Sequence, residues 1–261
     1  MRKICMSIYT TDTFFNGQLS VKQSRHGYRF SIDAVLLAHL AVVRPGERVV
    51  DLGAGCGIVS LLLAYKYPDI RLYGIELQQE LVIAAKDNVS ANHMQDQITI
   101  LQVDMKTLTT GFVGGPVDLV ISNPPYRKSG SGRINPDSQK ALARHEINIT
   151  LEGVIMTALR LLKRAGRFVV IYPAERMADI LTRMSSAGIE PKWLCMIHSS
   201  QKTHAKLMVI EGVKGGRPGM KIAPPLIIYR EDGTYTPTVE KMFGRQVEAY
   251  PNKIYPGADY D

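Results

Sequence analysis

The chain has 261 residues, 45% of them hydrophobic and 21% charged, and a net charge of +8, a composition typical of one globular unit with a full core. No apolar run reaches the roughly 18 residues that a membrane span requires, and the first residues lack a signal-peptide pattern, so we expect a cytoplasmic protein with no membrane partner. Three cysteines, far apart and odd in number, argue against a disulfide framework and a zinc site, and we expect no metal.

The first 47 residues read as a short extended pair followed by a helix over 34–43, where Ser31 or Asp33 can act as N-cap. From residue 48 onward, short apolar runs alternate with segments of helical spacing. The expected strands are 48–52, 71–76, 98–103, 117–122, 168–172, 192–198 and 205–213. One helix is expected to begin near residue 58, and others are expected over 78–94, 150–163 and 174–187.

This alternation predicts an α/β fold with a mostly parallel, Rossmann-like sheet of seven strands and helices on both faces. It divides the chain into an N-terminal extension over 1–47, a central domain over 48–213, and a basic tail rich in Gly and Pro over 214–261. Sheets of this kind bind ligands beyond the carboxyl ends of their strands. The residues that directly follow each strand are therefore the candidates for a functional site.

The first strand leads into a glycine-rich loop preceded by an acid. The loop contains Gly53, Gly55 and Gly57, which let the backbone turn tightly and approach a ligand closely. A dinucleotide-binding loop of the form G-x-G-x-x-G would need glycine at Ile58, and the acid Asp51 would repel a pyrophosphate. Asp51 instead suits a ligand that carries a positive charge.

Further acids stand at the ends of the next two strands, because Glu76 is the last residue of the second and Asp104 follows the third. Glu76 can accept hydrogen bonds from a ribose diol, and Asp104 can accept one from an adenine amino group. A helix cap at Glu76 and an ordinary turn at Asp104 are the alternative interpretations. Together with the loop, these acids resemble the class I S-adenosylmethionine-dependent methyltransferases over about residues 48–213. The resemblance implies S-adenosylmethionine as cofactor, without a metal, and contacts from Asp51, Gly53, Gly55, Gly57, Glu76, Leu77, Asp104, Met105 and Asn123.

The fourth strand ends in Asn123-Pro124-Pro125-Tyr126, the most specific motif in the chain. The two prolines stiffen the loop, remove two backbone donors and keep Asn123 out of the helical region. The Asn123 side-chain oxygen and the Pro124 carbonyl can accept the two hydrogens of a planar, weakly basic NH2 group, on which Tyr126 can stack. The motif therefore predicts catalysis that orients a nitrogen lone pair toward a methyl group, without a strong base.

Such motifs resemble those of methyltransferases that act on adenine N6, on guanine N2 and on the glutamine amide of release factors. The sizes of the two ends favour a compact RNA enzyme, because glutamine, guanine and DNA methyltransferases usually carry larger additional domains. Further stretches, including 27–38 and 143–146, resemble the bacterial tRNA1(Val) adenine-37 N6-methyltransferase family over nearly the full length. That resemblance implies methylation of adenine N6 in tRNA and places Arg29, Phe30 and Asp33 over the cofactor. A capped core helix explains Asp33 almost as well.

The positive charge is concentrated in two segments. Residues 127–145 contain five basic residues and one acid, and residues 212–230 contain four basic residues and no acid. This local excess predicts a surface that binds RNA through phosphates and shape, although solvated basic loops are the alternative. The predicted RNA-binding residues are Arg127, Lys128, Arg133, Lys140, Arg144, Lys214, Arg217 and Lys221.

Four other functions stay open at this stage. A protein glutamine N5-methyltransferase or a guanine-N2 rRNA methyltransferase would use the same motif. A non-catalytic RNA-binding module would keep the basic loops, and a small-molecule methyltransferase would not need them. No obligate protein partner is evident, and the sequence allows both a monomer and a homodimer.

Overall fold

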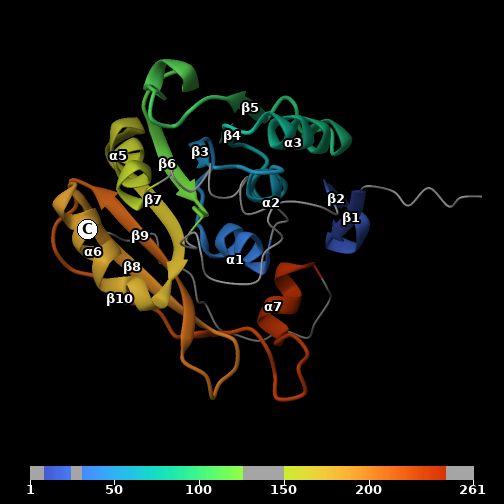
Figure 1. The fold of residues 1–261 in the computed structure, drawn as a ribbon, viewed down its shortest axis with the longest axis vertical. Coiled ribbons are helices and arrows are strands. Elements are labelled where there is room, and N and C mark those ends of the chain that lie inside the picture. The colour runs from blue at the N-terminus through green and yellow to red at the C-terminus, as the bar shows by residue number, and fades with distance from the viewer. Residues whose placement is uncertain (1–8, 25–30, 126–149, 245–261) are drawn as a thin grey trace, which may run out of the picture.

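A computed structural model describes the chain over residues 9–24, 31–125 and 150–244 (Figure 1). A nine-stranded sheet crosses the molecule in the order β10-β8-β9-β7-β6-β3-β4-β5, and β11 also pairs with β8. Within it, only β9 runs antiparallel to its neighbours. The strands are β3 (Arg48–Leu52), β4 (Arg71–Glu76), β5 (Ile98–Gln102), β6 (Val117–Ser122), β7 (Leu162–Pro173), β8 (Ile189–His198), β9 (Ala205–Lys214), β10 (Lys221–Ile222) and β11 (Leu226–Ile227).

The predicted mostly parallel sheet of seven strands is confirmed, with two additional two-residue strands beside β8. Two strand boundaries differ by three residues or more: β8 begins at Ile189 and not at Lys192, and β7 begins at Leu162 and not at Phe168. In β7, Lys163 and Arg164 are exposed and charged, and Ala165 has a left-handed φ of 60° where the pairing with β6 shifts register. An irregular, polar strand end of this kind has no alternating apolar pattern from which it could be predicted.

Helices cover both faces of the sheet. Apolar side chains that alternate along the strands form two clusters, as the strand pleat requires. One cluster packs against α1 (Ile32–Leu40), α2 (Ile58–Lys66), α3 (Gln79–Ala91) and α7 (Pro237–Met242). The other packs against α5 (Leu151–Leu161) and α6 (Met177–Ser186). None of the described helices is long and apolar enough to cross a membrane.

The N-terminal and C-terminal parts of the chain meet on the α1 face (Figure 1). A separate hairpin of β1 (Tyr9–Phe14) and β2 (Leu19–Ser24) turns through a short 3₁₀ helix and lies beside α2 and α3. The C-terminal segment packs α7 on α1, and Phe243 stacks on Phe14 with ring centres 5.6 Å apart. The hairpin, the central sheet and the C-terminal segment therefore contribute to one apolar cluster.

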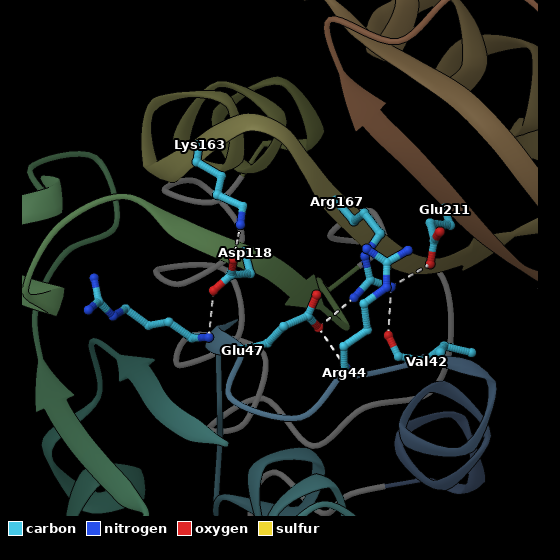
Figure 2. Close-up of polar contacts among 8 residues, drawn as sticks. Val42, Arg44, Glu47, Asp118, Lys163, Arg167 and Glu211 are labelled. Atoms are coloured by element: carbon cyan, nitrogen blue, oxygen red, sulfur yellow. Dashed lines mark hydrogen bonds and ion pairs between the residues drawn. The ribbon is translucent and has the colours of Figure 1, made fainter. Parts of the chain in front are cut away.

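A buried network of one arginine and two carboxylates lies at the end of the sheet where the parallel strands begin. Arg167 on β7 donates hydrogen bonds to the Val42 carbonyl at 2.6 Å and to the carboxylates of Glu47 at 2.6 Å and Glu211 at 3.3 Å (Figure 2). These contacts join the segment between α1 and β3 to β7 and β9. Nearby, Lys163 forms a more exposed ion pair with Asp118.

Candidate functional site

The carboxyl ends of β3, β4 and β6 meet at one edge of the sheet. Leu52 at the end of β3 pairs with Ser122 at the end of β6, and Glu76 follows the β4 partner of Leu52. Gly53 and Asn123 therefore begin their loops on adjacent strands, which lie about 4.8 Å apart in a sheet. The Ser122 hydroxyl also donates a hydrogen bond to the Leu52 carbonyl at 2.9 Å. The structure thus brings together the glycine-rich loop, the acid at the end of β4 and the Asn-Pro-Pro motif.

The glycine-rich loop has the conformation that its sequence predicts. Gly53, Gly55 and Gly57 have φ values of 78°, 58° and 86°, in the left-handed region that favours glycine. The N–H groups of Gly53 and Ala54 donate to the Ile75 carbonyl of β4 at 2.9 and 3.0 Å. The loop therefore turns back against β4 before α2 begins.

Asp51 lies beneath this loop with 1% of its surface exposed. Its carboxylate accepts a hydrogen bond from the Ser60 hydroxyl at 2.8 Å. Burial raises the pKa of Asp51 to about 7, the Ser60 hydrogen bond opposes that rise, and the Glu76 charge adds to it. A nearby cation would favour the ionised form of such a carboxyl. Sequence reasoning missed Ser60, for which a hydroxyl within an apolar helical run was the available signal.

Glu76 serves as a cap and as a contact of the loop. One carboxylate oxygen accepts from the N–H groups of Leu77 at 2.8 Å and Gln78 at 2.9 Å, at the start of α3. The other accepts from the N–H of Gly55 at 3.0 Å. Because each carboxylate oxygen has two lone pairs, these bonds leave capacity for a ligand hydroxyl.

A small pocket lies beyond β4 and β5. It is lined by Gly53, Ile75, Glu76, Leu77, Val103, Asp104 and Met105, five of which are predicted cofactor contacts. Asp104 accepts a hydrogen bond from the Lys106 N–H at 2.9 Å, so it also forms the turn that is its alternative interpretation. The contact of Asp104 with adenine stays a prediction.

Asn123, Pro124 and Pro125 directly follow β6, and the Asn123 side chain is partly exposed. Among the residues that the structure describes, none forms a hydrogen bond with the Asn123 amide. Several predicted site residues lie outside the described residues: Tyr126, Arg29, Phe30, Arg127, Lys128, Arg133, Lys140 and Arg144.

The start of α1 differs in detail from the prediction. Ser31 is the N-cap residue, but its side chain makes no capping hydrogen bond. Asp33 lies in the first turn of the helix and is buried. Neither side chain caps the helix, and the proposed cofactor contact of Asp33 stays a prediction.

The predicted RNA-binding residues of the tail lie away from this site. Lys214, the last residue of β9, pairs with the first residue of β8 and so lies at the edge opposite Asn123. Its ammonium donates to the carbonyls of Leu159 at 2.8 Å and Leu162 at 2.7 Å, at the end of α5. Arg217 follows in the turn after β9, and Lys221 pairs with the middle of β8. The structure does not bring Lys214 together with the Asn-Pro-Pro motif.

Comparison with known proteins agrees with this geometry. The family model described as the methyltransferase small domain matches residues 31–184. Two relatives are named tRNA1(Val) (adenine(37)-N6)-methyltransferase. The one from Porphyromonas gingivalis is 33% identical over 176 residues, which cover 65% of this chain and 68% of the relative. The one from Tolumonas auensis is 25% identical over 221 residues, which cover 84% of this chain and 90% of the relative.

Solved structures show the same fold. A predicted O-methyltransferase from Agrobacterium tumefaciens matches with a TM-score of 0.65 at 24% identity, over 84% of this chain and all of that chain (100%). An S-adenosylmethionine-dependent O-methyltransferase from Thermotoga maritima matches with a TM-score of 0.51 at 16% identity, over 75% of this chain and 69% of that chain.

The strand order, the acid before the glycine-rich loop and the acid after the next strand define a class I S-adenosylmethionine-dependent methyltransferase. Its sheet carries the antiparallel strand β9 between β7 and β8. The chain belongs to the methyltransferase small domain family and, within it, to the tRNA1(Val) (adenine(37)-N6)-methyltransferase family. The predicted fold class, family and S-adenosylmethionine dependence are confirmed.

Proposed function

We propose that this enzyme transfers a methyl group from S-adenosylmethionine to N6 of an adenine in tRNA. The observation that carries the proposal is Asn123-Pro124-Pro125 on β6, directly beside the end of β3 and its glycine-rich loop. The relatives are named for adenine 37 of tRNA1(Val), which supports an adenine in the anticodon loop. A tRNA substrate would also require the enzyme to be in the cytoplasm.

The residues after β3 and β4 fit the cofactor by their chemistry. Asp51 is a buried acid that a cationic amino-acid group would keep ionised. Glu76 keeps acceptor capacity for a ribose hydroxyl, and Asp104, which lines the neighbouring pocket, would accept from the adenine amino group. The bound cofactor supplies a methyl group on a positively charged sulfur.

Asn123 and Pro124 would hold the amine that receives the methyl group. An adenine N6 is a weak nucleophile because its lone pair is delocalised into the ring. If the Asn123 side-chain oxygen and the Pro124 carbonyl accept its two hydrogens, the lone pair turns toward the methyl group and the positive charge that develops on nitrogen is stabilised. We propose that Tyr126 stacks on the base, which the enzyme extracts from an RNA loop.

The basic segment that follows the motif is the proposed RNA surface. Arg127, Lys128 and Arg133 come within a few residues of Asn123 in the chain. Lys214, in contrast, lies at the opposite edge of the sheet and bonds to the end of α5. We therefore place RNA recognition on residues 127–145 and assign Lys214 to stability.

Incubation of the enzyme with labelled S-adenosylmethionine and unmodified total RNA, followed by nucleoside mass spectrometry, tests the function. We expect N6-methyladenosine in the tRNA fraction. N2-methylguanosine would indicate a guanine enzyme, and label in protein a glutamine methyltransferase, and either result would overturn the proposal. The Asn123→Ala variant serves as the negative control.

A further inference from the structure

Two asparagines at the end of α3 form hydrogen bonds with the N-terminal hairpin as a neighbouring strand would. The Asn88 side chain accepts a hydrogen bond from the Lys22 N–H at 2.8 Å and donates one to the Lys22 carbonyl at 2.9 Å. Asn92, one turn later, accepts from the Ser20 N–H at 2.9 Å and donates to the Ser20 carbonyl at 2.7 Å. Alternate residues of β2 thus bond to two side-chain amides in the way that they would bond to a strand.

Asn88 makes one contact that Asn92 lacks. Its second N–H donates to the Cys56 carbonyl at 3.0 Å, inside the glycine-rich loop. Asn88 is 1% exposed, and the Lys22 and Cys56 contacts satisfy both of its amide hydrogens. One buried amide therefore bonds to the hairpin and to the cofactor loop at once.

The contact is one of several that fix the loop, because the Gly53 and Ala54 N–H groups bond to β4 and the Gly57 N–H bonds to the Ala54 carbonyl at 2.9 Å. Gly55, before Cys56, is held through its N–H by Glu76, and the Gly57 position lies close to the Ala85 side chain of α3. A methyl group at Gly57 would come within 3.4 Å of the Ala85 methyl group. Because glycine adopts many backbone conformations, a loop of this kind needs external contacts to keep one of them. Asn88 supplies such a contact at the carbonyl between the two glycines.

We propose that Asn88 is a positioning residue that holds the glycine-rich loop in its cofactor-binding conformation and couples this loop to the N-terminal hairpin. The inference rests on the proposed use of the loop by S-adenosylmethionine and is independent of the identity of the RNA. An amide is required at this position, because Asp would face the Lys22 and Cys56 carbonyls without a hydrogen to donate. When a loop spends only a fraction of its time in the binding conformation, the measured dissociation constant rises by the inverse of that fraction.

Asn88→Ala and Asn92→Ala form a matched pair for the test. Each removes the two hydrogen bonds of one amide to β2, and only Asn88→Ala also removes the contact with Cys56. Calorimetric titration of the full chain with S-adenosylmethionine, without RNA, gives the dissociation constant, and thermal unfolding gives stability. We expect both variants to unfold at lower temperatures, and Asn88→Ala alone to raise the dissociation constant by roughly tenfold.

Measurements of kcat and KM distinguish a positioning role of Asn88 from a role in the chemical step. With saturating cofactor, kcat of Asn88→Ala should stay within about threefold of the parent value, whereas KM for S-adenosylmethionine rises with the dissociation constant. Equal cofactor affinities in the two folded variants would overturn the proposal and make Asn88 an anchor of the hairpin only. If Asn88→Ala does not fold, Asn88→Ser, which fills part of the space with an uncharged hydroxyl, is judged by the same criterion. Parent protein that binds cofactor but does not methylate RNA would contradict the proposed function and leave this inference intact.

Discussion

Arg167 donates a hydrogen bond to Glu47 across 2.6 Å, although the two residues are 120 positions apart in the chain. The side chain of Arg167 is 4% exposed and also pairs with the buried Glu211 (Figure 2). A buried cation between two carboxylates stabilises the fold only while all three charges are present, because each was removed from water.

Arg167→Met should therefore destabilise the protein strongly. It leaves Glu47 and Glu211 buried without their cation, and loss of one partner of such a network costs about 3–5 kcal/mol. Urea unfolding measures the change. Lys163→Ala is the control, since its ion pair with Asp118 is far more exposed and should contribute about 1 kcal/mol or less. Similar losses in the two variants would show that burial of the Arg167 network has no special weight.

Asp51→Asn should raise stability at alkaline pH. Burial raises the folded pKa of Asp51 from 3.8 to about 7. The stability that the protonated carboxyl contributes is complete below the unfolded pKa and is lost as pH rises through 7. Asparagine keeps an acceptor for the Ser60 hydroxyl and does not titrate. The free energy of unfolding at about pH 8 should therefore exceed that of the parent by roughly 2–4 kcal/mol, as measured by denaturant titration.

Asp51→Asn should weaken cofactor binding, although it raises stability. The ionised form of Asp51 attracts a cationic ligand, so the affinity of the parent for S-adenosylmethionine should increase between about pH 6 and about pH 8. In Asp51→Asn the affinity should be lower and nearly independent of pH over that range. A parent protein with pH-independent affinity would show that Asp51 has a structural role alone.

Asn123→Ala should abolish turnover while cofactor binding survives. The side-chain oxygen acts on the amine of the substrate, so its loss should reduce kcat by about 10²- to 10³-fold. Calorimetric titration with S-adenosylmethionine should give a dissociation constant close to that of the parent. An equal loss of cofactor affinity would show that Asn123 acts through its predicted cofactor contact and not on the amine.

The two basic segments should respond differently to neutralisation. Lys214→Met removes two hydrogen bonds to the carbonyls at the end of α5, so it should lower stability by about 1–2 kcal/mol and leave RNA affinity unchanged. Combined replacement of Arg127, Lys128 and Arg133 by alanine should weaken RNA binding. The slope of log affinity against log salt should fall by about one for each lost phosphate contact. A reduced slope in Lys214→Met would instead place RNA on the opposite edge of the sheet.

The strands around the site could be predicted because their signals are local. β3, β4 and β6 begin and end at the predicted residues, since each is a short apolar run followed by glycine, an acid or asparagine. Asn88 could not be assigned in this way. It lies on the buried side of an amphipathic helix, and its role depends on Lys22, 66 positions away, and on Cys56, 32 positions away.

The sequence by itself determined the α/β class, the glycine-rich loop with its preceding acid and the Asn-Pro-Pro motif, because each depends on neighbouring residues that act together within one loop. Only the tertiary structure decided which of the other polar residues support that site. Antiparallel β9 carries Lys214 to the edge opposite Asn123, and α3 brings Asn88 between the hairpin and the loop. Such contacts join segments far apart in the chain, so they exist only after the sheet and its helices have packed.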